Sequence, residues 1–304
     1  MDKMLDLIII GAGPAGLSAA VYAGRARLDF VLLEKSAVSG GQVLNTYEVD
    51  NYLGFQGING FELGMKFKEH AEKLGISSVS GEVISVELSG EVKTVVTDKD
   101  TYKARTVLIA TGAAHRRLGV PGEEELGGVG VSYCATCDGA FFKGMEAAVV
   151  GGGDVAVEDA IFLARLCSKV YVVHRRDEFR AAKVLTESLK KHDNVEYVWD
   201  SIVEEINGED EVQGITVKNL KTGENKHIPL NGVFVAIGMT PNTEPFTGSV
   251  GMDGTGYIKA GEDCRTDVLG VFAAGDVRTK QLRQIVTAVS DGANAIASVE
   301  RYLY

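Results

Sequence analysis

Two cysteines, Cys134 and Cys137, are separated by two residues in the segment SYCATCDGAFF, and Asp138 follows the second one directly. A Cys-x-x-Cys pair can cycle between a dithiol and a disulfide, because this spacing lowers the pKa of one thiol toward the range useful for exchange. The adjacent carboxyl group is a candidate acid for the proton that a leaving thiolate needs. The segment is therefore a candidate redox centre with Cys134, Cys137 and Asp138 as its catalytic residues.

Two other interpretations of the cysteine pair remain open from the sequence. The pair could be half of a zinc site, but structural zinc needs four ligands, usually including a second close pair. Cys167 is expected in the core at a helix end, Cys264 is expected to be a loop thiol, and the five histidines form no ligand pair, so no metal site is expected. Two inert buried cysteines are the other alternative, which leaves Asp138 without a role.

The cysteine pair lies just before the second of two similar stretches, LDLIIIGAGPAGLSAAVYAG and MEAAVVGGGDVAVEDAIFLA. Each begins with an apolar run short enough for a buried parallel strand, at 7–10 and 147–150. Each continues through a glycine-rich turn into apolar residues at helical spacing, and closes on a second β-branched run, at 30–33 and 170–173. This strand–turn–helix–strand pattern, found twice, predicts two Rossmann-like units.

The glycines of both turns match the dinucleotide-binding pattern G-x-G-x-x-G/A. The first turn reads Gly11-Ala12-Gly13-Pro14-Ala15-Gly16, and the second reads Gly151-Gly152-Gly153-Asp154-Val155-Ala156. In this pattern the first glycine permits a tight turn, the second admits a pyrophosphate close to the backbone, and the third small residue lets the helix pack on the strand. A single such turn is weak evidence, because it can be purely structural, but two in matching contexts are much stronger.

The residues that close the two units differ in charge. Glu34 ends the first unit, where a carboxylate can accept hydrogen bonds from both ribose hydroxyls and would repel a 2′-phosphate. The second unit ends at His174, Arg175 and Arg176, followed by Arg180, and guanidinium groups bind phosphate well. We therefore expect FAD or NAD at the first site and NADP(H) at the second. The alternative for the arginines is a solvated helix start with Arg176 and Arg180 one turn apart.

The composition is that of an acidic globular protein, with 304 residues, 45% hydrophobic residues and a net charge of −11. Such a surface disfavours binding to nucleic acid or anionic lipid. No apolar stretch is long enough to span a bilayer, and Asp6 and several glycines interrupt the apolar N-terminal segment, so we expect a cytoplasmic protein without membrane association. Four cysteines in this length do not suggest a secreted disulfide scaffold.

Similar strand-and-glycine segments recur in TVLIATG, VFVAIG and GVFAAGD, on both sides of the second unit. We therefore expect a first domain made of 1–112 and 240–304, with a second domain, 113–239, inserted into it. Both would be α/β domains with a parallel central sheet. Segments 82–105 and 203–230 alternate like antiparallel strands and predict a small antiparallel element in each domain.

The sequence resembles the low-molecular-weight thioredoxin reductases, a family of NADPH- and FAD-dependent pyridine nucleotide-disulfide oxidoreductases, over essentially its whole length. The resemblance rests on GAGPAG, GGQ, ATG, CATCDG, GGGDVA, HRRDEFRA and AAGDV. It implies that 1–112 and 240–304 bind FAD, that 113–239 binds NADPH, and that the protein is a homodimer. It also implies that Cys137 faces the flavin and that Cys134 attacks the disulfide of thioredoxin.

The resemblance carries over cofactor residues position by position. Those implied for FAD are Gly11, Gly13, Pro14, Ala15, Gly16, Glu34, Gly41, Gln42, Asn51, Thr111, Gly112, Gly275, Asp276, Arg283, Gln284 and Ile285. Those implied for NADPH are Gly151, Gly153, Asp154, Val155, His174, Arg175, Arg176 and Arg180. The chain departs from the family at Asp154-Val155, where Asn-Ser or Asp-Ser is common, and at Met239, where histidine often stands. Either departure could alter nicotinamide affinity.

These observations predict an enzyme that passes electrons from NADPH through FAD to the Cys134/Cys137 disulfide and then to thioredoxin or a thioredoxin-like protein. The dithiol and NADPH cannot both occupy the flavin face, so we expect 113–239 to rotate about links near 113–114 and 238–240. The alternatives are a flavin disulfide reductase or dithiol oxidase with another protein or small-molecule partner, a ferredoxin-linked relative, and a redox sensor without turnover. The arginine motif argues against the ferredoxin-linked relative.

Overall fold

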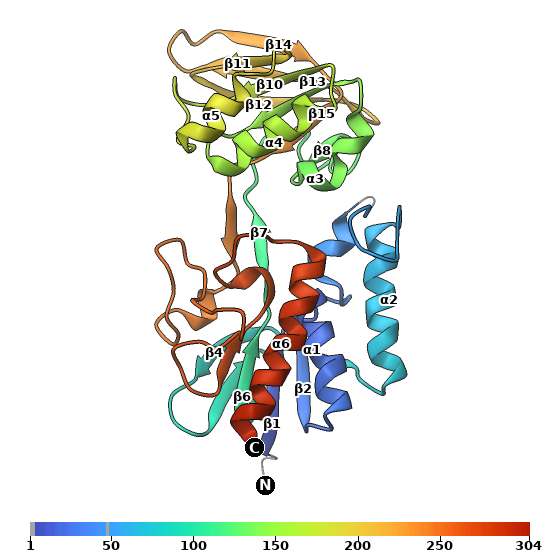
Figure 1. Ribbon diagram of the computed structural model, residues 1–304, viewed down its shortest axis with the longest axis vertical. Helices are drawn as coiled ribbons and strands as arrows, with labels where there is room; N and C mark the ends of the chain where they lie inside the picture. Colours follow the sequence, from blue (N-terminus) through green and yellow to red (C-terminus); the bar gives the residue numbers. More distant parts are fainter. Residues whose placement is uncertain (1–3, 47–48) are drawn as a thin grey trace. The chain divides into compact units, whose positions relative to one another are not determined.

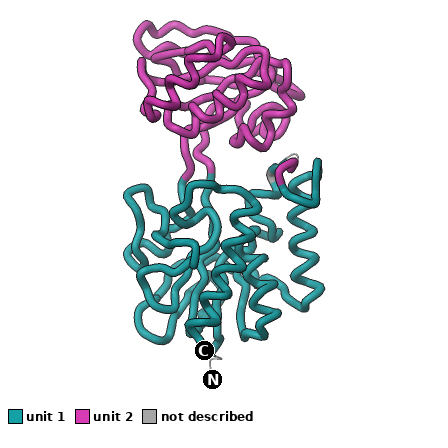
Figure 2. Tube along the Cα trace, viewed as in Figure 1, with its two compact units in different colours: residues 1–46, 52–114, 240–304 teal, residues 47–51, 115–239 magenta. Residues whose placement is uncertain are grey.

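The chain folds into two compact units in the computed structural model, which describes residues 4–46 and 49–304 (Figures 1 and 2). The first unit comprises Met1–Thr46, Tyr52–Ala114 and Thr240–Tyr304, and the second comprises Tyr47–Asn51 and His115–Met239. The chain passes between the units through two short strands that pair with each other, β7 (Ala113–His115) and β16 (Met239–Pro241). Which cofactor each unit binds stays a prediction.

A seven-stranded sheet forms the centre of the first unit, in the order β3-β2-β1-β6-β5-β4, with β17 also paired to β6. Its strands are β1 (Met4–Ile10), β2 (Phe30–Glu34), β3 (Ser78–Ser80), β4 (Val83–Glu87), β5 (Lys93–Thr97), β6 (Thr101–Ile109) and β17 (Val271–Ala273). The pairs β3–β2, β2–β1, β1–β6 and β6–β17 are parallel, whereas β5 pairs antiparallel with both β6 and β4.

The antiparallel strands predicted at 82–105 are confirmed, but they do not form a separate sheet. The first half of β6, at 101–104, pairs with β5, and its second half, at 107–109, pairs with β17. A single long strand therefore carries the antiparallel hairpin and part of the parallel sheet, and the hairpin extends the main sheet.

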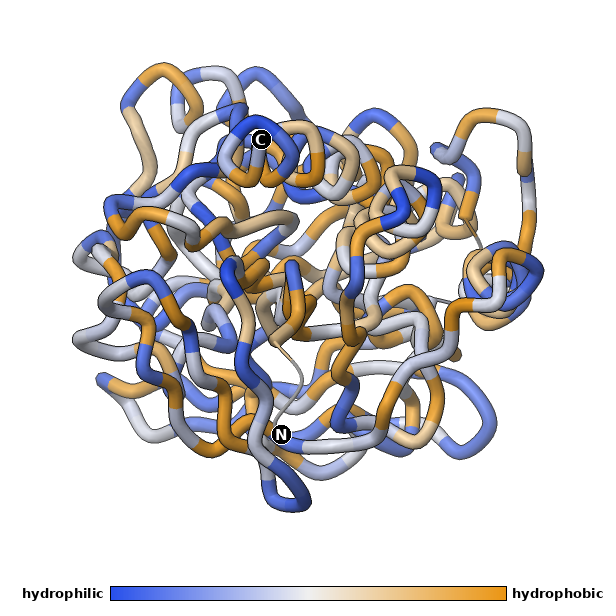
Figure 3. Tube along the Cα trace, turned by 90° about the horizontal axis from the view of Figure 1, so that it is seen from below, coloured by the Kyte–Doolittle hydropathy of each residue, from blue (hydrophilic) through white to orange (hydrophobic). Residues whose placement is uncertain are grey.

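Three helices belong to the first unit, and two of them are packed closely together (Figure 1). The helices are α1 (Pro14–Arg25), α2 (Gly60–Lys73) and α6 (Ile285–Leu303), and the 3₁₀ turns are η1 (Gly41–Asn45), η3 (Glu244–Phe246) and η4 (Gly275–Val277). A Cβ at Gly292 of α6 would lie 2.3 Å from the Ala15 carbonyl oxygen of α1. Hydrophilic and hydrophobic residues alternate around α6, beside the C-terminus in Figure 3, as expected for a helix with one buried face.

The second unit contains a five-stranded parallel sheet in the order β11-β10-β9-β15-β8. Its strands are β8 (Val131–Ser132), β9 (Glu146–Val150), β10 (Lys169–Val173), β11 (Val195–Val198) and β15 (Gly232–Val235). A separate antiparallel sheet confirms the element predicted at 203–230, with β12 (Ser201–Gly208), β13 (Val212–Asn219) and β14 (Asn225–Pro229). The unit also contains α3 (Ala135–Asp138), η2 (Gly139–Phe142), α4 (Asp154–Ala164) and α5 (Lys183–Leu189).

The central parallel strands of both large sheets are buried on their two faces. In β1, Leu7 and Ile9 belong to one hydrophobic cluster, whereas Ile8 and Ile10 belong to another. This burial explains why the strand is a continuous apolar run and does not alternate with polar residues. Among the described helices, none combines the length and apolar character that a membrane crossing needs.

Gly292→Ala is expected to lower the free energy of unfolding by about 1 kcal/mol or more. Its new Cβ would lie 2.3 Å from Ala15 O and 2.8 Å from Ala19 N, and such overpacking outweighs the roughly 1 kcal/mol by which alanine favours a helix. The control Gly254→Ala adds a Cβ with no atom within 4 Å and should change stability by less than about 0.5 kcal/mol. Urea unfolding measures both variants, and identical curves would contradict the close packing of α1 and α6.

Candidate active site

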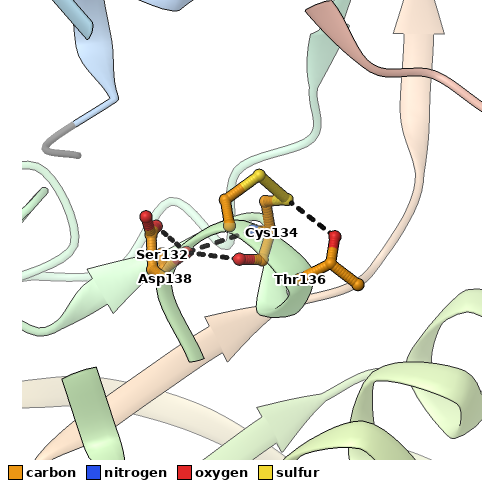
Figure 4. Close-up of a disulfide and its surroundings, with 5 residues drawn as sticks. Ser132, Cys134, Thr136 and Asp138 are labelled. Atoms are coloured by element: carbon orange, nitrogen blue, oxygen red, sulfur yellow. Dashed lines mark hydrogen bonds between the residues drawn. A yellow bond between two sulfur atoms is a disulfide. The ribbon is translucent and has the colours of Figure 1, made fainter. Parts of the chain in front are cut away.

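The two cysteines of the predicted redox centre are joined in a disulfide (Figure 4). Cys134 is the N-cap of α3 and Cys137 lies within this helix, so a single turn brings their Cα atoms to 5.3 Å. The backbone N–H groups of Cys137 and Asp138 both donate to Cys134 O. The disulfide supports the redox interpretation. In the described part of the chain, no group of three or more His, Cys, Asp and Glu side chains could hold a metal ion.

Ser132 links the candidate acid to the disulfide, although no sequence pattern indicated it. Its hydroxyl donates to Asp138 Oδ2, and it accepts a hydrogen bond from Cys134 N at 3.1 Å (Figure 4). The contact is local, because α3 begins directly after its N-cap Cys134, two residues beyond Ser132, and its single turn ends at Asp138. Ser132 therefore positions the carboxyl group of Asp138 relative to the backbone of Cys134.

The environment of Asp138 favours its protonated form. Its second oxygen, Oδ1, is buried and has no hydrogen-bond partner among the described residues. Burial raises the pKa of the Asp138 carboxyl group, and the hydrogen bond from Ser132 opposes this effect in part. A carboxyl group that keeps its proton to a higher pH is suited to protonate a leaving thiolate.

The first glycine-rich turn brings backbone against backbone. Gly11 has a φ of +102°, and a Cβ there would lie 2.5 Å from Ala110 O. Gly41 approaches the same turn, since its Cβ would lie 3.1 Å from the Cα of Gly13. Gly13 is the N-cap of α1 and provides no side-chain cap. The first-turn amides of α1 are thus available to a phosphate, as a helix N-terminus favours.

Glu34 is held against this turn by two backbone amides. Its Oε2 accepts from Ala12 N at 2.7 Å, and its Oε1 accepts from Ser36 N at 2.8 Å. Each oxygen keeps a further lone pair, so the carboxylate can still accept hydrogen bonds from ribose hydroxyls. The geometry fits the predicted role of Glu34.

Asp276 and Arg283 carry two of the buried polar atoms that lack a hydrogen-bond partner among the described residues, Asp276 Oδ1 and Arg283 Nε. Gly275 precedes Asp276 with a φ of +79°, and a Cβ there would lie 2.9 Å from the Cβ of Ala15. Burial raises the pKa of Asp276. The guanidinium of Arg283 lies 4.0 Å from the ring centre of Tyr257. Buried polar groups without partners are unusual and mark a candidate ligand site.

Other predicted FAD residues lie at the start of α6, in η1 and in the segments that connect these elements. Thr111 is tied to Asn242, which donates from Nδ2 to Thr111 O at 2.8 Å and accepts from Thr111 Oγ1 at 2.7 Å. Gln284 is the N-cap of α6 in a capping box, and Ile285 begins that helix. Gln42 is exposed in η1, and Asn51 belongs to the segment grouped with the second unit.

The second glycine-rich turn has the same backbone connections as the first. Gly151 N donates to Val173 O at 3.0 Å, as Gly11 N donates to Leu33 O at 2.8 Å. Arg180 N donates to the carbonyl of the second turn residue at 2.8 Å, and Gly40 N makes the equivalent bond in the first unit. The two units therefore share a backbone arrangement that does not depend on their different side chains.

The arginines of the second unit lie on a loop. Helix α5 begins only at Lys183, and Arg175, Arg176 and Arg180 are exposed before it. The alternative of a helix start with two arginines one turn apart is therefore wrong. Asp154 Oδ1 accepts from Ala182 N at 2.8 Å, so Asp154 ties residues 175–182, the arginine loop, to the glycine-rich turn.

His174 is buried beneath the second turn. A Cβ at Gly152 would lie 2.3 to 2.5 Å from atoms of its ring, which also packs near Phe179 and Trp199. Burial lowers the pKa of His174 most, and the nearby arginines lower it further, so the ring is neutral at pH 7. This placement favours a supporting role for His174 beneath the turn.

The fold and site define an oxidoreductase with two Rossmann-like units and a disulfide redox centre. The chain belongs to the pyridine nucleotide-disulphide oxidoreductase family, whose model matches residues 5–292. It is 48% identical over 303 residues to thioredoxin reductase of Bacillus subtilis (strain 168), covering 99% of this chain and 96% of that protein. It is 46% identical over 310 residues to thioredoxin reductase of Peptoclostridium acidaminophilum, covering 100% and 98%. The crystal structure of thioredoxin reductase from Streptococcus pyogenes MGAS5005 matches with a TM-score of 0.94 at 47% identity, covering 100% of this chain and 99% of that one.

Ser132→Ala is expected to raise the pKa of Asp138 further, because it removes the hydrogen bond that favours the charged carboxylate. The proton would then be held to a higher pH. The measurement is the pH dependence of the carboxyl carbon resonance of Asp138 in the oxidised protein, assigned with Asp138→Asn. Thr136→Ala is the control, because Thr136 contacts Cys134 Sγ at 3.4 Å. In Thr136→Ala, Asp138 should titrate as it does in wild type. A pKa of Asp138 that is unchanged or lowered in Ser132→Ala would refute the role of Ser132.

Proposed function

We propose that this protein is an NADPH-dependent thioredoxin reductase that binds FAD in the first unit and NADPH in the second. The observation that carries the proposal is the Cys134–Cys137 disulfide, followed by a buried carboxyl group, in a chain of this family. The 46% to 48% identity to proteins named thioredoxin reductase supports it. When bound, FAD supplies the two-electron transfer between a nicotinamide and a disulfide.

In this proposal the first glycine-rich turn and the N-terminus of α1 bind the pyrophosphate of FAD, and Glu34 binds its ribose. Asp276 and Arg283 would satisfy their buried, unpartnered atoms on the same cofactor. The remaining predicted FAD residues, Gln42, Asn51, Thr111, Gln284 and Ile285, stay part of the proposal. The fit rests on the close backbone approach at Gly11 and on these two unpartnered atoms.

The second turn and the arginine loop would bind NADPH. The exposed guanidinium groups of Arg175, Arg176 and Arg180 are suited to a 2′-phosphate, because they can form charge-assisted bidentate hydrogen bonds. The space beside Gly153 is open, since a Cβ there would meet no atom within 4 Å. Because glycine leaves this space empty, a pyrophosphate could approach the backbone there. Asp154 would keep the arginine loop beside the turn through its bond to Ala182 N.

The dithiol would work by thiol–disulfide exchange. Two electrons open the Cys134–Cys137 bond, and Asp138 provides a proton to one of the two sulfurs. The thiolate of Cys134 then attacks one sulfur of the thioredoxin disulfide, and the other sulfur of that disulfide leaves and takes the proton carried by Cys137. The thiolate of Cys137 attacks the Cys134 sulfur of the mixed disulfide, so the Cys134–Cys137 bond forms again and the second thioredoxin sulfur leaves and takes a proton from water.

Rotation of the second unit is part of the proposal. This unit carries both the disulfide and the proposed NADPH residues, and each must come within contact distance of the flavin at a different stage. The pivots would lie at the strands β7 and β16, which connect the units. We further propose a cytoplasmic homodimer, by analogy with the family.

The proposed function is tested by spectroscopy and turnover. The purified protein should be yellow, NADPH should bleach it anaerobically, and it should reduce thioredoxin disulfide with NADPH. Absence of bleaching would favour a ferredoxin donor or a redox sensor. Bleaching without reduction of any thioredoxin would favour another disulfide partner or an oxidase.

Cys134→Ser and Cys137→Ser are each expected to lower thioredoxin reduction by more than about a hundredfold, because each removes an exchanging sulfur. Flavin reduction by NADPH should continue in both variants. The control Cys167→Ala changes a cysteine that is buried and lies outside the disulfide, and it should keep thioredoxin reduction. Thioredoxin reduction that survives in both serine variants would make the disulfide purely structural.

Arg176→Ala is expected to raise KM for NADPH by about ten- to a hundredfold, because a charge-assisted hydrogen bond to phosphate is lost. The KM for NADH should change little, since NADH has no 2′-phosphate. Arg165→Ala is the matched control, because Arg165 is an exposed arginine at the C-terminal end of α4. Steady-state kinetics with both nucleotides measures the effect, and equal changes for NADH and NADPH would contradict phosphate recognition.

A further inference from the structure

A buried carboxylate on α6, Asp291, accepts four hydrogen bonds from the segment 275–280. The donors are Gly275 N at 2.9 Å, Arg278 Nε at 2.8 Å, Arg278 Nη2 at 2.7 Å and Lys280 Nζ at 2.9 Å. The side chains of Asp291, Arg278 and Lys280 are only 6%, 10% and 7% exposed. None of these three residues has a role in the function proposed above.

Asp291 is ionised despite its burial. Burial alone would raise its pKa, but the hydrogen bonds from Arg278 and Lys280 outweigh this effect and lower it. The third donor of the guanidinium, Arg278 Nη1, is also satisfied, by Ala260 O at 3.2 Å and Thr279 O at 3.0 Å. Buried ion pairs often add little stability compared with apolar residues of similar volume, so a network of this kind is better explained by the geometry that it holds.

The network holds the segment that contains both unpartnered atoms of the candidate FAD site. Gly275 N, bound by Asp291, directly precedes Asp276, whose Oδ1 is buried without a partner among the described residues. The carbonyl of Arg278 accepts from Arg283 Nη2 at 3.5 Å, and Arg283 Nε is the second unpartnered atom. Asp291 therefore reaches Asp276 through the adjacent Gly275, and it reaches Arg283 through Arg278.

We propose that Asp291 is a positioning residue for FAD, which holds segment 275–283 through Gly275 and Arg278 so that Asp276 and Arg283 are already arranged for binding. This inference rests on the proposed function, which supplies FAD as the ligand. Preorganisation of this kind increases affinity, because the segment does not have to be ordered when the cofactor binds.

The first variant is Asp291→Asn, which keeps the shape of the side chain and removes its charge. It is expected to raise the Kd for FAD by about ten- to a hundredfold, because charge-assisted hydrogen bonds to Arg278 and Gly275 are lost or weakened. The measurement is a titration of FAD-free protein with FAD, followed by flavin fluorescence. Circular dichroism gives the folded fraction of each FAD-free sample, and Kd is calculated for the folded fraction alone.

Asp267→Asn is the matched control. Asp267 is an exposed carboxylate in the same unit that also accepts from a glycine amide, Gly251 N at 2.8 Å. This variant should bind FAD with the Kd of wild type.

Arg278→Lys keeps the experiment decisive if Asp291→Asn does not fold. Lysine retains the positive charge but cannot form the two-pronged contact with Asp291, so the Kd for FAD should rise by several-fold to about tenfold. Two results would overturn the proposal: a Kd within about threefold of wild type in the variants that fold, or a loss of binding wholly explained by the unfolded fraction.

Failure of this inference can be told apart from failure of the proposed function. If wild type binds no FAD, the proposed function fails. If wild type binds FAD and reduces thioredoxin while Asp291→Asn and Arg278→Lys bind FAD equally well, only the role of Asp291 is refuted.

Discussion

Direct contact of backbone with backbone at the glycine-rich turns is the constraint on which both units depend. A Cβ at Gly16 would lie 1.8 Å from Gly11 O, and a Cβ at Gly151 would lie 2.3 Å from Ala236 O. A side chain at Gly16 would keep α1 away from the turn that follows β1, and a side chain at Gly151 would keep the second turn away from the end of β15. In the first unit Ala15, at the start of α1, also packs closely against two more glycines. A Cβ at Gly275 would lie 2.9 Å from Ala15 Cβ, and a Cβ at Gly292 would lie 2.3 Å from Ala15 O. The turn, η4 and α6 are thereby assembled around one small residue.

The two units use one backbone plan with different chemistry attached to it. In the first, a carboxylate at the end of β2 accepts from the amide of Ala12. In the second, the ring of His174 occupies the space beneath Gly152, and the charged groups come from the exposed loop that follows. A carboxylate beside the turn suits free ribose hydroxyls, whereas an arginine loop suits a phosphate. The proposed difference in bound dinucleotide therefore requires divergence only at and after the end of the second strand.

All four buried side-chain atoms that lack a hydrogen-bond partner among the described residues belong to predicted site residues, namely Asp138, His174, Asp276 and Arg283. Asp138 lies beside the disulfide, and Asp276 and Arg283 lie on the segment that Asp291 holds. Burying such groups costs free energy unless they are paired, so proteins retain them where a ligand or a proton is to be bound. The two buried carboxyl groups, Asp138 and Asp291, differ in how the cost of their burial is compensated. Burial raises the pKa of Asp138, whereas the pKa of Asp291 is lowered despite its burial, because Arg278 and Lys280 donate hydrogen bonds to it.

The sequence by itself determined the features that are local. The glycine-rich turns, the apolar strands on either side of them, the Cys-x-x-Cys pair and the antiparallel segments all have short-range patterns, and the family resemblance they carry is confirmed by the comparisons. Only the tertiary structure decided which distant side chains meet. Asp291 reaches Gly275 because α6 packs on η4, and β4 and β5 join the main sheet because β6 is long enough to pair with both β5 and β17. A single polar residue has no periodicity that marks its partner, since the partner is set by how whole elements pack.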